Sequence, residues 1–349
     1  MLTNVILALG ALASTATANP LPAKFEVIEA RATACTFTNT ADLAKSKKTL
    51  KSGAHVVFQG KTTFGYKEWE GPLIQISGEK ITVEGASGHI IDADGARWWD
   101  GQGGNGGKTK PKLLAVKGLN NSIVKGLNFK DQPVHGISVN TVNNLQLIDV
   151  TLDASAGDSK GGHNTDGFDV GNAQNILISG AIVKNQDDCL AINSGTNITF
   201  TGGNCSGGHG LSIGSVGNRS NNVVKTIRIN NSKISNSDNG VRIKTISGAT
   251  GSVSDVIYDT ITLSNIAKNG IVIEQDYENG SPTGTPTAGV PITGLTINKV
   301  VGTVASKGTN VYILCAKGAC SNWKWSGVNV TGGGKPKSCQ NVPSPAACS

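Results

Sequence analysis

The chain has 349 residues, of which 38% are hydrophobic, only 16% are charged and 46 are glycine. Abundant glycine and few long helix formers argue against a helical protein, and the glycines lack the three-residue period of collagen. The formal net charge of +7 predicts an anionic partner, but the basic residues are scattered and not interleaved with aromatic residues, which argues against nucleic acid.

Residues 1–18 have the features of a signal peptide. Val5 to Ala13 form an apolar run of suitable length, and Ala16-Thr17-Ala18 supplies a small-residue cleavage site. A buried N-terminal strand is the alternative interpretation of this run. We interpret residues 19–31 as a pro-segment that ends at Arg31, and residues 32–349 as one catalytic domain. No other segment has the roughly 18 apolar residues of a membrane helix, so we expect a secreted, extracellular protein without a membrane partner.

Secretion favours disulfide bonds among the seven cysteines. Sequence alone does not fix their connectivity, but local spacing favours Cys189–Cys205, Cys315–Cys320 and Cys339–Cys348, which leaves Cys35 without a partner. A zinc site is disfavoured by the lack of a Cys-x2-Cys pair, and we predict no metal and no cofactor. Seven glycosylation sequons fit a secreted surface and begin at Asn120, Asn197, Asn204, Asn218, Asn230, Asn279 and Asn329.

From about residue 80 the chain consists of short β-branched runs separated by turn-forming residues. One pattern recurs, in which a small residue precedes apolar residues at alternate positions, with successive copies 31, 22, 21, 30 and 30 residues apart; they begin at Gly136, Gly167, Cys189, Gly210, Gly240 and Gly270. Such a period is typical of a solenoid, and the weak helix signal favours an all-β, right-handed parallel β-helix in a single domain. A β-sandwich or jelly roll is the alternative.

Polar residues occupy the same place on successive repeats, directly before or on the recurring strands; they are Asp166, Asp187, Asp188, His209, Arg242 and Lys244. Neighbouring strands lie about 4.8 Å apart, so Asp166 and Asp188 should be roughly 5 Å apart, with His209 and then the two cations on the next coils. Polar residues that converge on one stripe of a solenoid indicate a binding groove.

Clustered carboxyl groups suit glycoside hydrolysis, in which one carboxyl donates a proton and another activates water. Crowding of like charges raises the pKa of one of them and so separates the two roles. Arg242 and Lys244 could hold the carboxylates of an acidic sugar. Each of these residues alone also fits a turn or an outward strand face, and it is their shared stripe that favours chemistry. Other aspartates are interpreted as structural or solvated; these are Asp94, Asp153, Asp158 and Asp169.

Four motifs resemble the signatures of the polygalacturonases, glycoside hydrolase family 28. The motifs are Asn164-Thr165-Asp166, Asp187-Asp188, Gly208-His209-Gly210 and Arg242-Ile243-Lys244, and they stand in the family's order. The chain most resembles the fungal endo-acting members, from about Cys35 to the C terminus. The resemblance implies an inverting hydrolase of homogalacturonan, an anionic polysaccharide, and we expect a monomer.

The resemblance also implies roles for individual residues. Asp187 resembles the general acid, Asp166 and Asp188 the pair that activates water, and His209 the residue that tunes the acid or contacts the sugar. The remaining matches imply substrate binding by Arg242, Lys244, Tyr277 and Asn164. Gln132 stands where the family has a Trp, and we expect an altered groove contact there.

Three other functions remain open. An exo-acting polygalacturonase or a rhamnogalacturonase would share the fold, although no large insertion that would close one end of the groove is evident. A pectate lyase would need calcium, which Asp166, Asp187 and Asp188 could hold. A non-catalytic pectin-binding solenoid would need no ordered acid and base.

Overall fold

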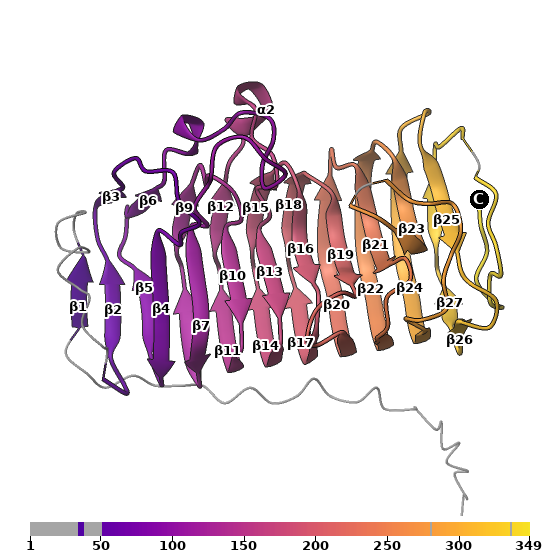
Figure 1. Cartoon of the computed structure of the whole chain (residues 1–349), viewed down its shortest axis with the longest axis horizontal. Helices are drawn as coiled ribbons and strands as arrows, with labels where there is room; N and C mark the ends of the chain where they lie inside the picture. Colours follow the sequence, from indigo (N-terminus) through magenta and orange to yellow (C-terminus); the bar gives the residue numbers. More distant parts are fainter. Residues whose placement is uncertain (1–33, 38–50, 280, 336) are drawn as a thin grey trace, which may run out of the picture.

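The computed structural model describes residues 34–37, for which only the backbone is considered, and residues 51–279, 281–335 and 337–349. These residues form a right-handed parallel β-helix whose coils stack along the long axis of the molecule, as Figure 1 shows. The described helices are short: η1 (Gly95–Arg97) and α2 (Gly157–Lys160). The predicted fold class is confirmed. The predicted signal peptide, the pro-segment and the side chain of Cys35 lie outside the described residues.

One face of the β-helix is a sheet of nine parallel strands, in which each strand pairs with the next coil. Its strands are β4 (Ile74–Glu79), β7 (Leu114–Asn120), β10 (Ile137–Asn140), β13 (Phe168–Gly171), β16 (Asp188–Ile192), β19 (Gly210–Val216), β21 (Asn239–Ile246), β23 (Asn269–Tyr277) and β25 (Thr309–Leu314).

The remaining strands are joined into a second, 19-stranded parallel sheet that forms the other sides of the coils. They are β1 (Ala34–Phe37), β2 (His55–Phe58), β3 (Lys61–Thr63), β5 (Thr82–Gly85), β6 (Ile90–Asp92), β8 (Ser122–Lys125), β9 (Asn128–Lys130), β11 (Asn143–Ile148), β12 (Thr151–Asp153), β14 (Ala173–Ser179), β15 (Ile182–Asn185), β17 (Gly195–Thr201), β18 (Asn204–Gly207), β20 (Val223–Ser235), β22 (Ser252–Ile266), β24 (Ile292–Val304), β26 (Cys320–Ser321), β27 (Lys324–Ser326) and β28 (Asn329–Thr331).

The recurring apolar pattern sets the register of the nine-stranded sheet. The first apolar residue of each repeat pairs with its counterpart on the next coil, and all six have no exposed surface: Ile137, Phe168, Leu190, Leu211, Val241 and Ile271. Because side chains alternate across a strand, the residue after each of these points outward. The outward row contains Ser138, Asp169, Ala191, Ser212 and Arg242; of these, Asp169, Ala191 and Arg242 line the cleft described below.

Turns between coils are held by stacked asparagines. Asn197 donates a hydrogen bond to the side-chain oxygen of Asn175 at 2.7 Å, and Asn175 donates to that of Asn143 at 2.8 Å. Asn175 and Asn197 have positive φ, a conformation that asparagine tolerates better than most residues. These ladders stabilise the stack and leave the nine-stranded sheet free to carry function.

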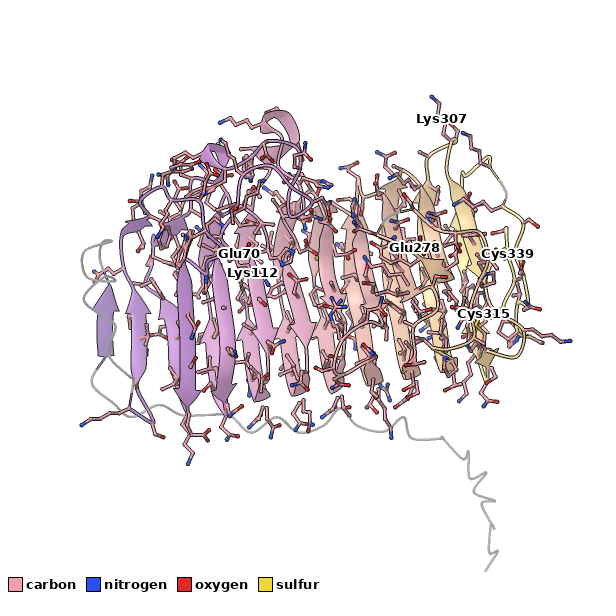
Figure 2. All side chains as sticks on the ribbon, viewed as in Figure 1. Glu70, Lys112, Glu278, Lys307, Cys315 and Cys339 are labelled. Carbon is pink, nitrogen blue, oxygen red and sulfur yellow. A yellow bond between two sulfur atoms is a disulfide. The ribbon has the colours of Figure 1, made fainter. Side chains whose placement is uncertain are left out.

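Three disulfides link the pairs that local spacing favoured: Cys189–Cys205, Cys315–Cys320 and Cys339–Cys348. Cys315 and Cys339 lie at the C-terminal end of the stack (Figure 2). Among the described residues, no helix has the length and apolar character that crossing a membrane requires.

Candidate active site

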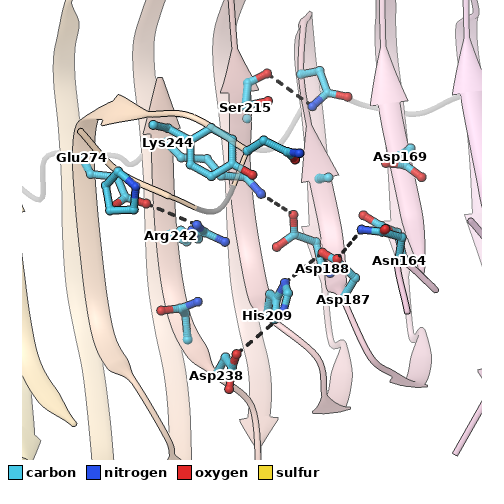
Figure 3. Close-up of a pocket in the computed structure, with 18 of the residues that line it drawn as sticks. Asn164, Asp169, Asp187, Asp188, His209, Ser215, Asp238, Arg242, Lys244 and Glu274 are labelled. Atoms are coloured by element: carbon cyan, nitrogen blue, oxygen red, sulfur yellow. Dashed lines mark hydrogen bonds and ion pairs between the residues drawn. The ribbon is translucent and has the colours of Figure 1, made fainter. Parts of the chain in front are cut away.

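The predicted polar stripe is assembled by backbone hydrogen bonds between successive coils. Gly136 N donates to Asp166 O at 2.8 Å, and Gly167 N donates to Asp188 O at 2.9 Å. On the next coil, His209 N donates to Asp187 O at 2.9 Å. The side chains line a cleft of about 400 Å³ whose other walls include Asn164, Arg242, Lys244 and Tyr277, so all eight predicted site residues lie together (Figure 3).

A β-bulge lies where the two consecutive aspartates enter the sheet. Asp188 pairs with Gly210 and Leu190 pairs with Leu211, so Cys189 is the extra residue on β16. A bulge redirects the side chains beside it. Gly208 adopts φ +63°, and a Cβ there would lie 2.0 Å from Asp187 O, so only glycine lets the next coil pass this close.

The Asp187 carboxylate receives three hydrogen bonds. His209 Nδ1 lies 3.0 Å from Oδ1, the backbone N–H of Asp188 donates to the same oxygen at 2.7 Å, and Asn164 Nδ2 donates to Oδ2 at 2.8 Å. Burial alone would raise the pKa of Asp187, but the hydrogen bond and charge of His209, with the charge of Lys244, hold this pKa well below its usual range. In the free site, Asp187 is therefore ionised.

Asp188 is ion-paired inside the protein. Its Oδ2 accepts a hydrogen bond from Lys244 Nζ at 2.8 Å, and its Oδ1 accepts one from Ser212 Oγ at 2.6 Å. Burial would lower the pKa of Lys244, but the nearby charge of Asp188 raises it overall. Lys244 therefore stays charged at neutral pH and well above it.

Asp166 has the opposite environment. Its side chain is 9% exposed, and its Oδ1 has no hydrogen-bond partner. Burial raises the pKa of Asp166 well above its usual value, and the charges of Asp187, Asp169 and Asp188 raise it further. Asp166 therefore keeps its proton to higher pH than an ordinary aspartate.

His209 lies between two carboxylates. Its Nδ1 faces Asp187, and its Nε2 lies 3.5 Å from Asp238 Oδ2, which also contacts Lys268 Nζ at 2.7 Å. Burial would lower the pKa of His209, but the hydrogen bond and charge of Asp187 raise it overall. With a carboxylate at each ring nitrogen, both nitrogens act as donors and the imidazolium is favoured.

Two cations and an aromatic ring form the wall on the C-terminal side. The Arg242 guanidinium lies 5.4 Å from the centre of the Tyr277 ring, and Lys244 Nζ lies 5.2 Å from it. Arg242 also pairs with Glu274 Oε1 at 3.2 Å, which fixes its position. A guanidinium held in place beside a ring is suited to binding a carboxylate through two parallel hydrogen bonds.

Comparison with known proteins identifies the family of this arrangement. The family model Glycosyl hydrolases family 28 matches residues 28–348. This chain belongs to that family. It is 61% identical to Endopolygalacturonase 1 of Colletotrichum lindemuthianum, over 97% of this chain and 98% of that protein. It is 56% identical to the polygalacturonase of Cochliobolus carbonum, over 99% of both. The solved structure of endopolygalacturonase I from Stereum purpureum with two galacturonates aligns with a TM-score of 0.73 and 37% identity, covering 86% of this chain and 95% of that one.

The family 28 cleft also contains residues that the sequence analysis did not place there. Asp169, which was interpreted as structural or solvated, lines the cleft with its Oδ2 3.2 Å from His135 Nδ1. Burial raises the pKa of Asp169, although His135 and Lys112 oppose the rise. The register supplied a signal for this residue, since Asp169 stands in the same outward row as Arg242.

Gln132, where the family has a Trp, makes no contact in the groove. Gln132 has no exposed surface, and its side chain donates to Thr165 O at 3.0 Å beneath the groove. It therefore supports the turn that carries Asp166 from beneath the groove. Asp238 and Glu274 were likewise missed, because each becomes part of the site only through a cation or imidazole on a neighbouring coil.

The donor set of this family 28 site fits poorly with calcium. Both oxygens of Asp187 accept hydrogen bonds, and both oxygens of Asp188 face donors, one of them the Lys244 ammonium. Calcium needs six to eight oxygen ligands with free lone pairs. The contacts favour proton transfer by carboxyl groups over a cation-dependent elimination.

Proposed function

We propose that this chain is a secreted endo-polygalacturonase that hydrolyses internal α-1,4-galacturonosidic bonds of homogalacturonan with inversion, acting as a monomer. The observation that carries the proposal is the 2.8 Å contact between Lys244 and Asp188, which joins the carboxyl cluster to the cationic wall. One groove thus offers acid–base groups and uronate-binding groups side by side. The names of the curated relatives support the same substrate class.

Asp187 acts as the general acid, and His209 supplies its proton. In the free site, the two form an ion pair at 3.0 Å. A bound sugar chain excludes water, and an ion pair loses stability in a less polar medium relative to its neutral form. The proton then moves from the imidazolium to Asp187, which can pass it to the leaving glycosidic oxygen.

Asp188 and Asp166 activate the attacking water. Asp188 is held in place by hydrogen bonds from Lys244 and Ser212. Asp166 carries a proton in the free site partly because the charge of Asp187 repels its ionised form. When Asp187 becomes neutral, that repulsion disappears and Asp166 can ionise by releasing its proton to bulk water, so protonation of the acid prepares the base.

Arg242 and Lys244 bind the carboxylate of the galacturonate next to the cleaved bond, and Tyr277 packs beside it. Asn164 lies on the other side of Asp187 from this cationic wall and contacts the reacting sugar there. Because the guanidinium matches a planar carboxylate and a neutral hydroxymethyl group cannot replace it, this wall selects uronic acids over neutral hexoses.

The shape of the groove supports cleavage within a chain. A depression that shares His135, Asp169, Asn193 and Arg219 with the catalytic cleft continues to Lys112, which Figure 2 marks on the N-terminal side. In the other direction, the cleft reaches Lys268. A polymer therefore has room on both sides of the carboxyl cluster, as an endo-acting enzyme requires.

The test is a product assay on polygalacturonic acid with EDTA, following reducing ends, viscosity and ultraviolet absorbance together. We expect a rise in reducing ends, a rapid fall in viscosity and no unsaturated product, with activity lost in Asp187→Asn. Unsaturated product, or dependence on added calcium, would instead identify a lyase. Slow viscosity loss with free galacturonate would identify an exo-acting hydrolase. Retained binding with no product would identify a binding protein.

A further inference from the structure

A glycine-rich segment, residues 101–107, has no part in the chemistry described so far. We call it the strap. Gly101 N donates to Gly161 O at 2.9 Å, which ties the strap to the turn that carries the catalytic motif. At its other end, the buried Lys110 pairs with Asp100 at 2.8 Å. The strap is therefore anchored at both ends, although most of its residues are exposed.

The tip of the strap contacts Asn164. Gly104 N donates to Asn164 Oδ1 at 3.0 Å, and Asn105 Nδ2 donates to the same oxygen at 3.3 Å. A backbone N–H can only donate, so Oδ1 must face the strap and Nδ2 must face the other way. That direction leads to Asp187 Oδ2 at 2.8 Å. The strap thus fixes which end of the Asn164 amide faces Asp187.

Close packing also supports this arrangement. Gly103 is buried with φ +58°, and a Cβ there would lie 2.3 Å from Asn164 Oδ1. Asn164 itself has φ +51°, which asparagine tolerates. Asn105 also accepts a hydrogen bond from Asn279 Nδ2 at 3.4 Å, on the far wall of the cleft. Close approach to Asn164 explains the glycine at position 103.

We propose that Asn105 is a positioning residue for hydrolysis, which together with the Gly104 N–H orients the Asn164 amide as a donor to Asp187. The proposal rests on the proposed role of Asp187 as the acid. By donating to the ionised carboxylate, Asn164 sets how readily Asp187 takes up its proton. The other charged or titratable groups around this contact are His209, Lys244, Asp166, Asp188 and, beside Asn105 at 3.5 Å, His163.

The main test is Asn105→Asp. A carboxylate at this position cannot donate to Asn164 Oδ1 and attracts the NH₂ group, so the Asn164 amide should turn and present its oxygen to Asp187. Two or three donors can lower a carboxyl pKa by about 2 units, so losing one should raise the Asp187 pKa by about 0.5–1 unit. We expect kcat to fall, because an amide oxygen facing Asp187 disfavours the carboxylate that remains after the acid has given up its proton.

Two variants separate orientation from added charge. Asn105→Ala removes one of two donors and no charge, so kcat should fall by less. Gln102→Glu adds the same charge to the strap without touching Asn164, and its kcat should match the wild type. Equal falls of kcat in Gln102→Glu and Asn105→Asp, with none in Asn105→Ala, would overturn the proposal.

A second measurement needs no substrate. Titration of ¹³C-labelled aspartate carboxyl groups by NMR, with the Asp187 signal assigned through Asp187→Asn, should show the same order of pKa values in the free protein. An unchanged Asp187 signal in Asn105→Asp would refute the positioning role. If the wild type fails to hydrolyse polygalacturonic acid while the NMR order holds, the proposed function fails and the contact stands.

Discussion

Replacing each of two neighbouring active-site carboxyls by its isosteric amide should change stability in opposite directions. Asp166→Asn should stabilise the protein at pH 7, because burial and three nearby carboxylates raise the pKa of Asp166 well above its usual value. Asp187→Asn should destabilise it, because His209, Asn164 and the Asp188 N–H hold the pKa of Asp187 low.

The sign follows from proton linkage. An unfolded aspartate titrates near pH 3.9, whereas folded Asp166 keeps its proton to higher pH, so its favourable contribution is present below about pH 4 and lost as the pH rises. One pKa unit corresponds to about 1.4 kcal/mol, so Asp166→Asn should gain about 1 kcal/mol or more at pH 7 and almost nothing at pH 3.

For Asp187 the sign is reversed. Its contribution is fully present above about pH 4 and declines as the pH falls toward the lowered pKa of the folded state. The amide oxygen can still accept from His209 and Asp188, but the new NH₂ group faces the Asn164 NH₂ group. Losing that charge-assisted bond should cost about 1.5–3 kcal/mol at pH 7.

Urea unfolding followed by tryptophan fluorescence at pH 3 and pH 7 measures both differences. Comparison of the two pH values within each variant controls for any change in packing. A destabilised Asp166→Asn at pH 7, similar in size to Asp187→Asn, would show that the two carboxyls share one protonation state, and the assignment of the resting proton would be wrong.

Two further outcomes test the cationic wall. Lys244→Met leaves its buried carboxylate partner unpaired and should lower the free energy of unfolding in urea by about 3–5 kcal/mol. Lys268→Met, at an exposed ion pair, should lower it by about 1 kcal/mol or less. Equal losses of unfolding free energy in the two variants would contradict the buried ion pair. Arg242→Lys keeps the charge but loses the planar fork, so kcat/KM on polygalacturonic acid should fall about 10–100-fold, mainly through KM; a fall confined to kcat would place Arg242 in the chemical step instead.

The sequence predicted the coil register because one local rule repeats. Each small residue followed by alternating apolar residues buries the same position, and the pairing of Ile137 with Phe168, and of Phe168 with Leu190, follows from that rule. The same rule brought Asp166, Asp187 and His209 to one stripe. Side-chain alternation also places Asp169 in the outward row. It was left out of the predicted site because it was interpreted as a structural or solvated residue.

Other features depended on contacts that no local pattern contains. The bulge at Cys189 arises because β16 has one more residue than β19 between two successive paired positions. The strap reaches Asn164 from 60 residues earlier, and its tip meets Asn279 from 174 residues later. Such loops extend away from the repeat, so the period that fixes the core gives no information on where they lie.

The charge balance of the cleft explains how an acidic site can receive an acidic polymer. Six carboxyl groups line it, and most are neutralised within the protein: Lys244 pairs with Asp188, Arg242 with Glu274, and Lys268 with Asp238, while His209 pairs with Asp187. The remaining two, Asp166 and Asp169, have raised pKa values, so they keep their protons and carry no charge to higher pH than ordinary aspartates. The protons that make the chemistry possible therefore also remove the repulsion that would exclude a uronate, so binding and catalysis depend on the same acidic conditions.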